Sequence, residues 1–227
     1  MKSLGDAGGF FLRCQKMGER PFGIKSSYIL FYKPYGVLSQ FSDNSGRRTL
    51  KAFGPFPRDI YPVGRLDADS EGLLLLTNDG PAKHLLLEPR YGHQRTYLVQ
   101  VERVPSENAL ARLRAGVTIE GRKTKQATVT LIDPEPSVPL REIPIRLRKS
   151  IPTAWLEIAL TEGRNRQIRK MTASVGHPTL RLIRTKLGPL TLTGLNPGEH
   201  RPLSKLELHS LLASTNHSPV SWRNPAT

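Results

Sequence analysis

Three carboxylates stand at alternate positions of one short segment: Asp67, Asp69 and Glu71. The apolar run from Leu73 to Leu76 follows directly and predicts a short buried strand. A loop at the entrance of such a strand is a place where a rigid scaffold can present a reactive group. An ionised carboxylate in that position can act as a nucleophile or as a base. This segment is therefore the first candidate for catalysis, with Asp67 as its leading residue.

Two other interpretations of the same segment stay open. The first is a polar loop that is simply solvated at the edge of a sheet. The second is calcium binding, because the spacing of Asp67, Asp69 and Glu71 before Gly72 overlaps the start of an EF-hand loop. The twelfth position of that loop is Asn78, where a bidentate Glu is wanted, and an apolar strand follows in place of a helix. The pattern therefore fits calcium poorly.

The charge of the chain indicates a polyanionic partner. The formal net charge is +15 and the sequence pI is about 10.4. Residues 141–186 hold eleven Lys or Arg and three acidic residues, so about half of the excess lies in a fifth of the chain. A solvated basic surface is the alternative, but this concentration favours a face that binds the phosphates of a nucleic acid.

Composition excludes several other classes. Cys14 is the only cysteine, which rules out an internal disulfide or a cysteine-based zinc site and fits a reducing cytoplasm. The six histidines are scattered without metal-ligand spacing. The chain lacks the run of about 18 apolar residues that a membrane span requires. We expect a cytoplasmic protein, a monomer, with no membrane association.

The candidate residues must be positioned by a mixed set of strands and helices. Apolar runs, alternation and turn residues predict strands at 28–33, 73–77, 96–101, 126–132, 153–160, 179–183 and 190–193. Capping residues and helical spacing predict helices at 49–53, 81–87, 106–116 and 164–175, and a last one opened by Ser204. The order lacks regular βαβ alternation, so we expect an α+β fold with a largely antiparallel sheet.

Several segments resemble motifs of one enzyme family. Residues 64–80 resemble the catalytic motif of the RsuA/RluA-type pseudouridine synthases, in which the first Asp is essential. Residues 29–37 are similar to the entry strand of that family, with Tyr32 in place of a common Asn. Residues 95–99 resemble its second motif and residues 162–171 its third. The resemblance covers residues 28 to about 205, including a further element at 182–188.

This resemblance implies roles for individual residues. Asp67 takes the place of the essential carboxylate, Tyr97 lies against the target base, and Arg169 takes the place of the active-site basic residue. We expect Arg169 to hold Asp67 in its ionised form. The third motif, its flanks and the catalytic loop supply the predicted RNA-binding residues: Arg65, Arg148, Lys149, Arg164, Arg166, Lys170 and Arg184.

The family's reaction would be the isomerisation of uridine to pseudouridine, without cofactor or metal. Attack at C1′, addition to the base and proton abstraction at C2′ all remain open for Asp67. A paired uridine cannot be reached inside a helix, so we expect base flipping into a central RNA-binding cleft. The expected sheet is the family's mixed, largely antiparallel one with flanking helices. Residues 27–213 would form a two-lobed catalytic domain without an S4 domain, between flexible tails at 1–26 (basic) and 214–227.

Two further segments narrow the expected substrate. Residues 40–50 and 148–153 look like a subgroup of the family that modifies one uridine of 23S ribosomal RNA near the peptidyl-transferase region. The rival hypothesis is an RNA-binding or ribosome-assembly protein without catalysis. A carbohydrate hydrolase that uses Asp67 and Glu71 fits less well, because the chain is basic and only 7% aromatic.

Overall fold

The computed structural model describes residues 26–88, 92–145 and 150–214, so the predicted tails lie almost wholly outside the described residues. In chain order the elements are β1 (Tyr28–Lys33), the 3-10 helix η1 (Leu50–Phe53), β2 (Tyr61–Pro62), β3 (Glu71–Thr77), α2 (Gly80–Leu87), β4 (Arg95–Glu102), α3 (Glu107–Ala115), β5 (Thr118–Ile119), β6 (Arg122–Lys123), β7 (Thr128–Ile132), β8 (Thr153–Leu160), α4 (Gln167–Ser174), β9 (Thr179–Leu187), β10 (Leu190–Thr191), β11 (His200–Pro202) and α5 (Lys205–Ala213).

One large sheet organises the described part of the chain. Its strand order is β11-β1-β3-β9-β4-β8-β7, with β2 beside β3 and β10 beside β9. The pair β3 and β9 is parallel and the other pairs of this sheet are antiparallel. Strands β5 and β6 form a separate small hairpin. The predicted α+β class with a mixed, largely antiparallel sheet is therefore confirmed.

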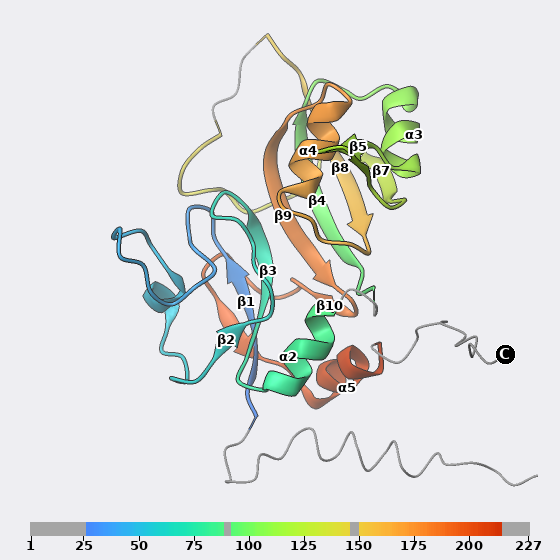
Figure 1. The fold of residues 1–227 in the computed structure, drawn as a ribbon. Helices are drawn as coiled ribbons and strands as arrows, with labels where there is room; N and C mark the ends of the chain where they lie inside the picture. Colours follow the sequence, from blue (N-terminus) through green and yellow to red (C-terminus); the bar gives the residue numbers. More distant parts are fainter. Residues whose placement is uncertain (1–25, 89–91, 146–149, 215–227) are drawn as a thin grey trace, which may run out of the picture.

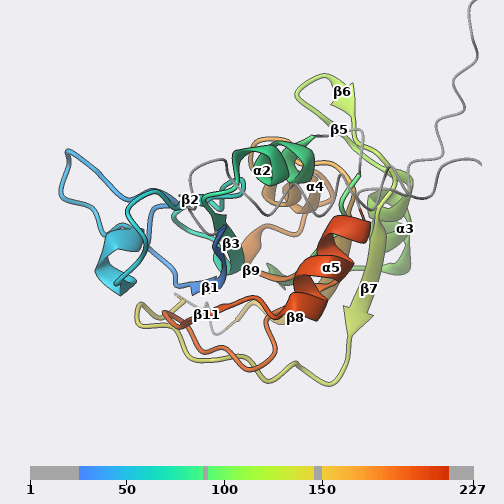
Figure 2. The ribbon, with the colours of Figure 1, turned by 90° about the horizontal axis from the view of Figure 1, so that it is seen from below.

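The sheet has two halves, each with its own helices (Figure 1). Strands β1, β2, β3 and β11 lie with α2 and α5, whereas β4, β7, β8 and most of β9 lie with α3 and α4. The halves meet where β3 runs beside β9, and the register joins them at two residue pairs, Glu71 with Ile183 and Gly72 with Arg184. Figure 2, which views the molecule from below, shows α2 and α4 on the same face of the sheet.

Strand β3 is buried along its whole length because both of its faces are covered. Leu73 and Leu75 pack in a cluster with apolar side chains of α2 and α5. Leu74 and Leu76 pack on the opposite face with side chains of β1 and η1. An uninterrupted apolar run is what a strand between two layers requires. The strand therefore gives a rigid base to the loop that precedes it.

Helix starts follow the capping residues that the sequence predicts. Ser106 accepts a hydrogen bond from Ala109 N at the start of α3. Ser204 opens α5 in a complete capping box, in which its side chain accepts from Glu207 N and the Glu207 carboxylate accepts from Ser204 N. These reciprocal bonds satisfy backbone N–H groups that the first turn leaves without partners.

Several predicted boundaries are wrong. Strand β3 begins at Glu71 and not at Leu73, β7 begins at Thr128 and not at Gln126, and β10 ends at Thr191 and not at Thr193. Two more differences affect the site. Helix α4 begins at Gln167, not at Arg164, because Arg166 adopts a left-handed conformation with φ 50° and ψ 34°. That conformation turns the chain sharply and cannot continue a right-handed helix backwards. Strand β9 extends from Thr179 to Leu187, past the predicted end at Ile183, because β4 continues to pair with it.

A buried ion pair lies where the two halves of the sheet meet. Glu71 accepts from Arg181 Nε at 2.9 Å and from Arg181 Nη2 at 2.7 Å, and both side chains are almost completely buried. Arg141, in the connection between β7 and β8, lies 3.9 Å from Glu71 and stacks over the Tyr35 ring at 3.7 Å. Arg181 also donates to Pro139 O at 2.8 Å. The carboxylate of Glu71 therefore binds that connection to the centre of the sheet.

Candidate active site

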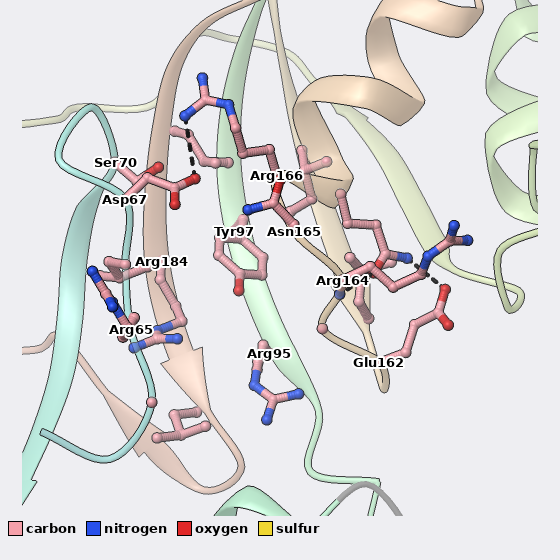
Figure 3. Close-up of a pocket in the computed structure, with 18 of the residues that line it drawn as sticks. Arg65, Asp67, Ser70, Arg95, Tyr97, Glu162, Arg164, Asn165, Arg166 and Arg184 are labelled. Atoms are coloured by element: carbon pink, nitrogen blue, oxygen red, sulfur yellow. Dashed lines mark hydrogen bonds and ion pairs between the residues drawn. The ribbon is translucent and has the colours of Figure 1, made fainter. Parts of the chain in front are cut away.

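A cleft of about 880 Å³ opens between the two halves of the sheet. Its walls come from the loop before β3, from α2, β4 and β9, and from the segment that leads into α4 (Figure 3). Ligand pockets of proteins commonly measure ~300–1,000 Å³. The cleft is therefore large enough for a nucleotide, and Asp67 and Tyr97 both line it.

The loop that carries Asp67 is held on both sides of that residue. Ser39 Oγ donates to Leu66 O at 2.7 Å and accepts from Leu66 N at 3.0 Å. Gly36 N donates to Ala68 O at 2.7 Å. The segment after β1 thus fixes the backbone next to Asp67, and the carboxylate is presented from a restrained loop.

A buried lysine also binds the backbone of the loop that carries Asp67. Lys33, at the end of β1, is completely buried, and its Nζ donates to three backbone carbonyls: Pro34 O at 2.9 Å, Val37 O at 2.7 Å and Ala68 O at 3.4 Å. Burial lowers the pKa of Lys33 to about 8, although the carboxylates of Glu71, Asp69 and Asp67 act in the opposite direction. Lys33 therefore places a cation beside the loop that carries Asp67.

Arg166 is the direct ionic partner of Asp67. Arg166 Nη1 lies 3.4 Å from Asp67 Oδ2, and the same guanidinium binds Asp69 at 3.1 and 2.7 Å. The left-handed backbone of Arg166 precedes α4, and its side chain extends towards the loop before β3, as Figure 3 shows. About 39% of the Asp67 side chain stays exposed. The carboxylate is therefore held by a cation and still open to a substrate.

Asp69 links this pair to the rest of α4. Burial opposes its ionisation, but the hydrogen bond from Arg166 and the charge of Arg169 outweigh burial and hold the pKa of Asp69 below its ordinary value. Arg169 Nε lies 3.4 Å from Asp69 Oδ2, and Arg169 Nη2 donates to Asp69 O at 2.7 Å. The contact expected between Arg169 and Asp67 is thus replaced by one with Asp69. The early turn at Arg166 explains the difference, since it brings Arg166 to Asp67 instead.

Tyr97 faces the cleft from β4, on the wall opposite the loop that carries Asp67. Its ring lies between Asp67 and Arg95 in Figure 3. In the register of the sheet Tyr97 pairs with Arg184 of β9, next to an irregularity between Thr96 and Tyr97. The strand thus holds an aromatic ring in the cleft, where a base could stack on it. The catalytic roles of Asp67, Tyr97 and Arg169 stay predictions.

The predicted RNA-binding residues lie in different surroundings. Arg65 is exposed at the cleft, whereas Arg184 also lines the cleft but is only 4% exposed. Arg148 and Lys149 lie outside the described residues. Arg65 therefore remains accessible to a phosphate backbone, and Arg184 does not have the exposure that such a role requires.

Two of these residues hold the small hairpin of β5 and β6. Arg164 donates to Ile119 O at 2.9 Å and to Arg122 O at 3.1 Å. Lys170 Nζ lies 2.6 Å from Glu120 Oε1. These contacts give Arg164 and Lys170 a structural role, whatever they bind in addition.

The sequence reasoning missed Lys33, Ser39 and Arg95 as parts of the site. Lys33 lies within the segment that resembles the entry strand, but its sequence position gives no sign that it is buried. Arg95 begins the segment that resembles the second motif and lines the cleft below Tyr97. In the described ranges we find no group of three or more His, Cys, Asp or Glu side chains placed to hold a metal ion. No helix of these ranges is long and apolar enough to cross a membrane.

Comparison with known proteins places this site in a family. Residues 27–174 match the family model described as RNA pseudouridylate synthase. The chain is 53% identical over 171 residues to the ribosomal large subunit pseudouridine synthase E of Xanthomonas axonopodis pv. citri. This alignment covers 74% of this chain and 90% of the relative. The chain is 37% identical over 191 residues to the ribosomal large subunit pseudouridine synthase B of Bacillus subtilis, covering 84% of this chain and 73% of the relative.

Solved structures show the same fold. A crystal structure of pseudouridylate synthase superposes with a TM-score of 0.69 at 28% identity and covers 82% of this chain and 74% of that chain. The human protein RNA pseudouridylate synthase domain containing 1 gives a TM-score of 0.50 at 15% identity over 78% of each chain, a likeness of fold alone.

Proposed function

Because the chain belongs to the RNA pseudouridylate synthase family and is therefore an isomerase, we propose that it converts one uridine of large-subunit (23S) ribosomal RNA to pseudouridine, with Asp67 as the catalytic carboxylate. The observation that carries the role of Asp67 is its position: a restrained loop presents it to the cleft, beside Arg166 and opposite Tyr97. The relatives named ribosomal large subunit pseudouridine synthase support the choice of RNA.

The reaction breaks the N1–C1′ bond and forms a C5–C1′ bond; the proton on C5 is lost, and N1 takes up one proton, so the atoms balance. Asp67 takes part by attack at C1′, by addition to the base or by removal of the C2′ proton. Each route requires an ionised carboxylate close to the ribose or the base. Arg166 lies 3.4 Å from the Asp67 carboxylate and orients the side chain. Tyr97 supplies a ring for the uracil to stack on and a hydroxyl group near C5.

The cleft receives a single nucleotide in this proposal, so the target uridine leaves the RNA helix before it reacts. Unstacking costs free energy, which contacts of the flipped base and of the flanking backbone must offset. Arg65 is exposed at the cleft and suits a phosphate contact. The net charge of +15 predicts affinity that falls steeply with salt. We further propose that the enzyme works as a monomer in the cytoplasm, where ribosomal RNA is assembled.

Asp67→Asn tests the proposal because it keeps the shape of the side chain and removes its charge. The single-turnover rate on a large-subunit rRNA fragment should fall at least ~10³-fold, within the range for loss of a catalytic acid or base. RNA affinity should stay within about twofold. Asp133→Asn, the same change at an exposed position outside the cleft, serves as the control.

Full activity of Asp67→Asn would refute the catalytic assignment. Tight RNA binding by the wild-type protein without any pseudouridine, on large-subunit rRNA mapped nucleotide by nucleotide, would favour the non-catalytic ribosome-assembly alternative.

A further inference from the structure

Arg184 is a buried cation at the cleft that no carboxylate balances within the described residues. Its Nε donates to Leu73 O at 2.7 Å, while its Nη2 is buried and has no hydrogen-bond partner. No ion pair to Arg184 is found in the described ranges, although it lines the cleft. Burial lowers the pKa of Arg184, and the neighbouring Tyr97 works against that effect. The guanidinium therefore lies in the wall of the cleft against the Tyr97 side chain, without a carboxylate partner among the described residues.

The backbone fixes Arg184 relative to the catalytic loop. Gly72 pairs with Arg184 across β3 and β9, and a Cβ at Gly72 would lie 2.3 Å from Arg184 O. Only a residue without a side chain permits this approach. Gly72 follows Asp67 by five residues, so the same strand entrance sets the positions of the carboxylate and the guanidinium. On its other side Arg184 pairs with Tyr97.

The carboxylates around the cleft already have partners. Asp67 and Asp69 bind Arg166. Glu162 accepts from Lys125 N and from the Gln167 side chain. An isolated buried charge is costly, and it becomes favourable only when a counter-charge or hydrogen-bond acceptors reach it. In the free protein Arg184 has Leu73 O and the Tyr97 side chain as partners, and a carbonyl oxygen of the substrate adds the negative partner that the described residues do not supply.

The position of Arg184 favours the base over a phosphate as that acceptor. Arg184 is 4% exposed and next to Tyr97, whereas Arg65, at the same cleft, is exposed. RNA phosphates stay at the surface, while a flipped base enters the pocket. The base also gains negative charge in the reaction. Loss of uracil from C1′ leaves the bonding electron pair on the ring, and attack at C6 sends an electron pair towards C5 and O4.

We infer that the guanidinium of Arg184, in the wall of the cleft, donates a hydrogen bond to a carbonyl oxygen of the target uracil and stabilises the negative charge that develops there. This inference rests on the proposed function, and it gives Arg184 a catalytic role in place of the backbone-binding role predicted from the sequence. It holds for each of the three routes open to Asp67, since all of them place negative charge on the uracil. Loss of one such donor typically lowers kcat about 10²–10³-fold.

Arg184→Met removes the charge and keeps most of the volume. With saturating rRNA fragment, the single-turnover rate should fall about 10²–10³-fold. The Kd for RNA should stay within about twofold, and Tm should be unchanged or higher because an unbalanced buried charge has been removed. A purely structural role would instead lower Tm. Arg112→Met, the same change at an exposed position of α3, is the control and should behave like the wild type.

Arg184→Lys provides a second test that does not depend on Arg184→Met being folded. A buried lysine has a depressed pKa, so the rate of this variant should decline as pH rises through neutrality, whereas the wild-type rate should not. An Arg184→Lys enzyme with the wild-type pH profile would overturn the inference. A folded Arg184→Met enzyme that keeps more than about a third of the wild-type rate would do the same.

The wild-type reaction separates the two proposals. Absence of pseudouridine with the wild-type protein would refute the proposed function and this inference together. Product from the wild type and from Arg184→Met at similar rates would refute the inference alone.

Discussion

Glu71→Gln should destabilise the protein strongly. The substitution removes the carboxylate that pairs with the buried guanidinium of Arg181. The Arg181 and Glu71 side chains are 6% and 3% exposed and share two hydrogen bonds of 2.7 and 2.9 Å. Glutamine fills the same space but accepts fewer bonds and carries no charge. Removing one partner of a buried ion pair costs ~3–5 kcal/mol. For a chain of this size each kcal/mol corresponds to ~2–4 °C, so Tm should fall by about 6–20 °C.

Thermal unfolding followed by circular dichroism or calorimetry measures this effect. Glu107→Gln is the matched control, because Glu107 pairs with Arg114 at the surface and is 75% exposed. Surface pairs contribute ~0–1 kcal/mol, so the control should lose less than about 4 °C. The connection between β7 and β8 should also become more sensitive to protease in Glu71→Gln, since Arg141 and Arg181 hold it. A Glu71→Gln protein that melts within about 2 °C of the wild type would refute the reasoning.

Three further predictions concern stability. In the folded protein the pKa of Lys33 is about 8, whereas its ordinary value is 10.5. Between these two pH values the unfolded chain binds more protons than the folded protein does. The free energy of unfolding should therefore rise with pH across this range, by up to about 3 kcal/mol. Urea titrations of the wild type and of Lys33→Met check this, and an equal rise in both proteins would contradict it. Gly72→Ala should lower the free energy of unfolding by about 2–6 kcal/mol through overpacking and backbone strain. Gly46 also has a positive φ but open space around it, so Gly46→Ala should lower it by only about 1–2 kcal/mol in the same titrations. Ser204→Ala should lower Tm by about 2–4 °C through loss of the capping box, and an unchanged melting curve would show that α5 does not depend on it.

Most of the fold could be predicted because strands and helix starts leave patterns in a few neighbouring residues of the sequence. Apolar runs and alternation are visible in β1, β4 and β8, and Ser204 identifies the start of α5. The strands β2, β5, β6 and β11 have two or three residues each, which is too short for a periodic pattern. Strand β3 begins at Glu71, and burial of that carboxylate depends on Arg181, 110 residues later in the chain. No local pattern reveals such a partner.

The site was predictable only where a motif could be matched. Asp67 and Tyr97 lie together at the cleft, as the resemblance implied. The contact between Asp67 and Arg166 was not predictable, since it depends on the left-handed backbone of a residue that is not glycine. The burial of Lys33 and Arg184 was equally hidden, because both are basic residues in a strongly basic chain and composition assigns them to the surface.

The narrow junction between the two halves of the sheet has a consequence for how this enzyme can diverge. Its two residue pairs, Glu71 with Ile183 and Gly72 with Arg184, include both the buried carboxylate and the arginine that faces the cleft. The residues that hold the two halves together are therefore adjacent to the arginine that lines the cleft, so a change in the packing of the junction would also shift Arg184. The exposed Arg65 can change without touching this junction, whereas replacement of Glu71 removes the carboxylate that pairs with the buried Arg181.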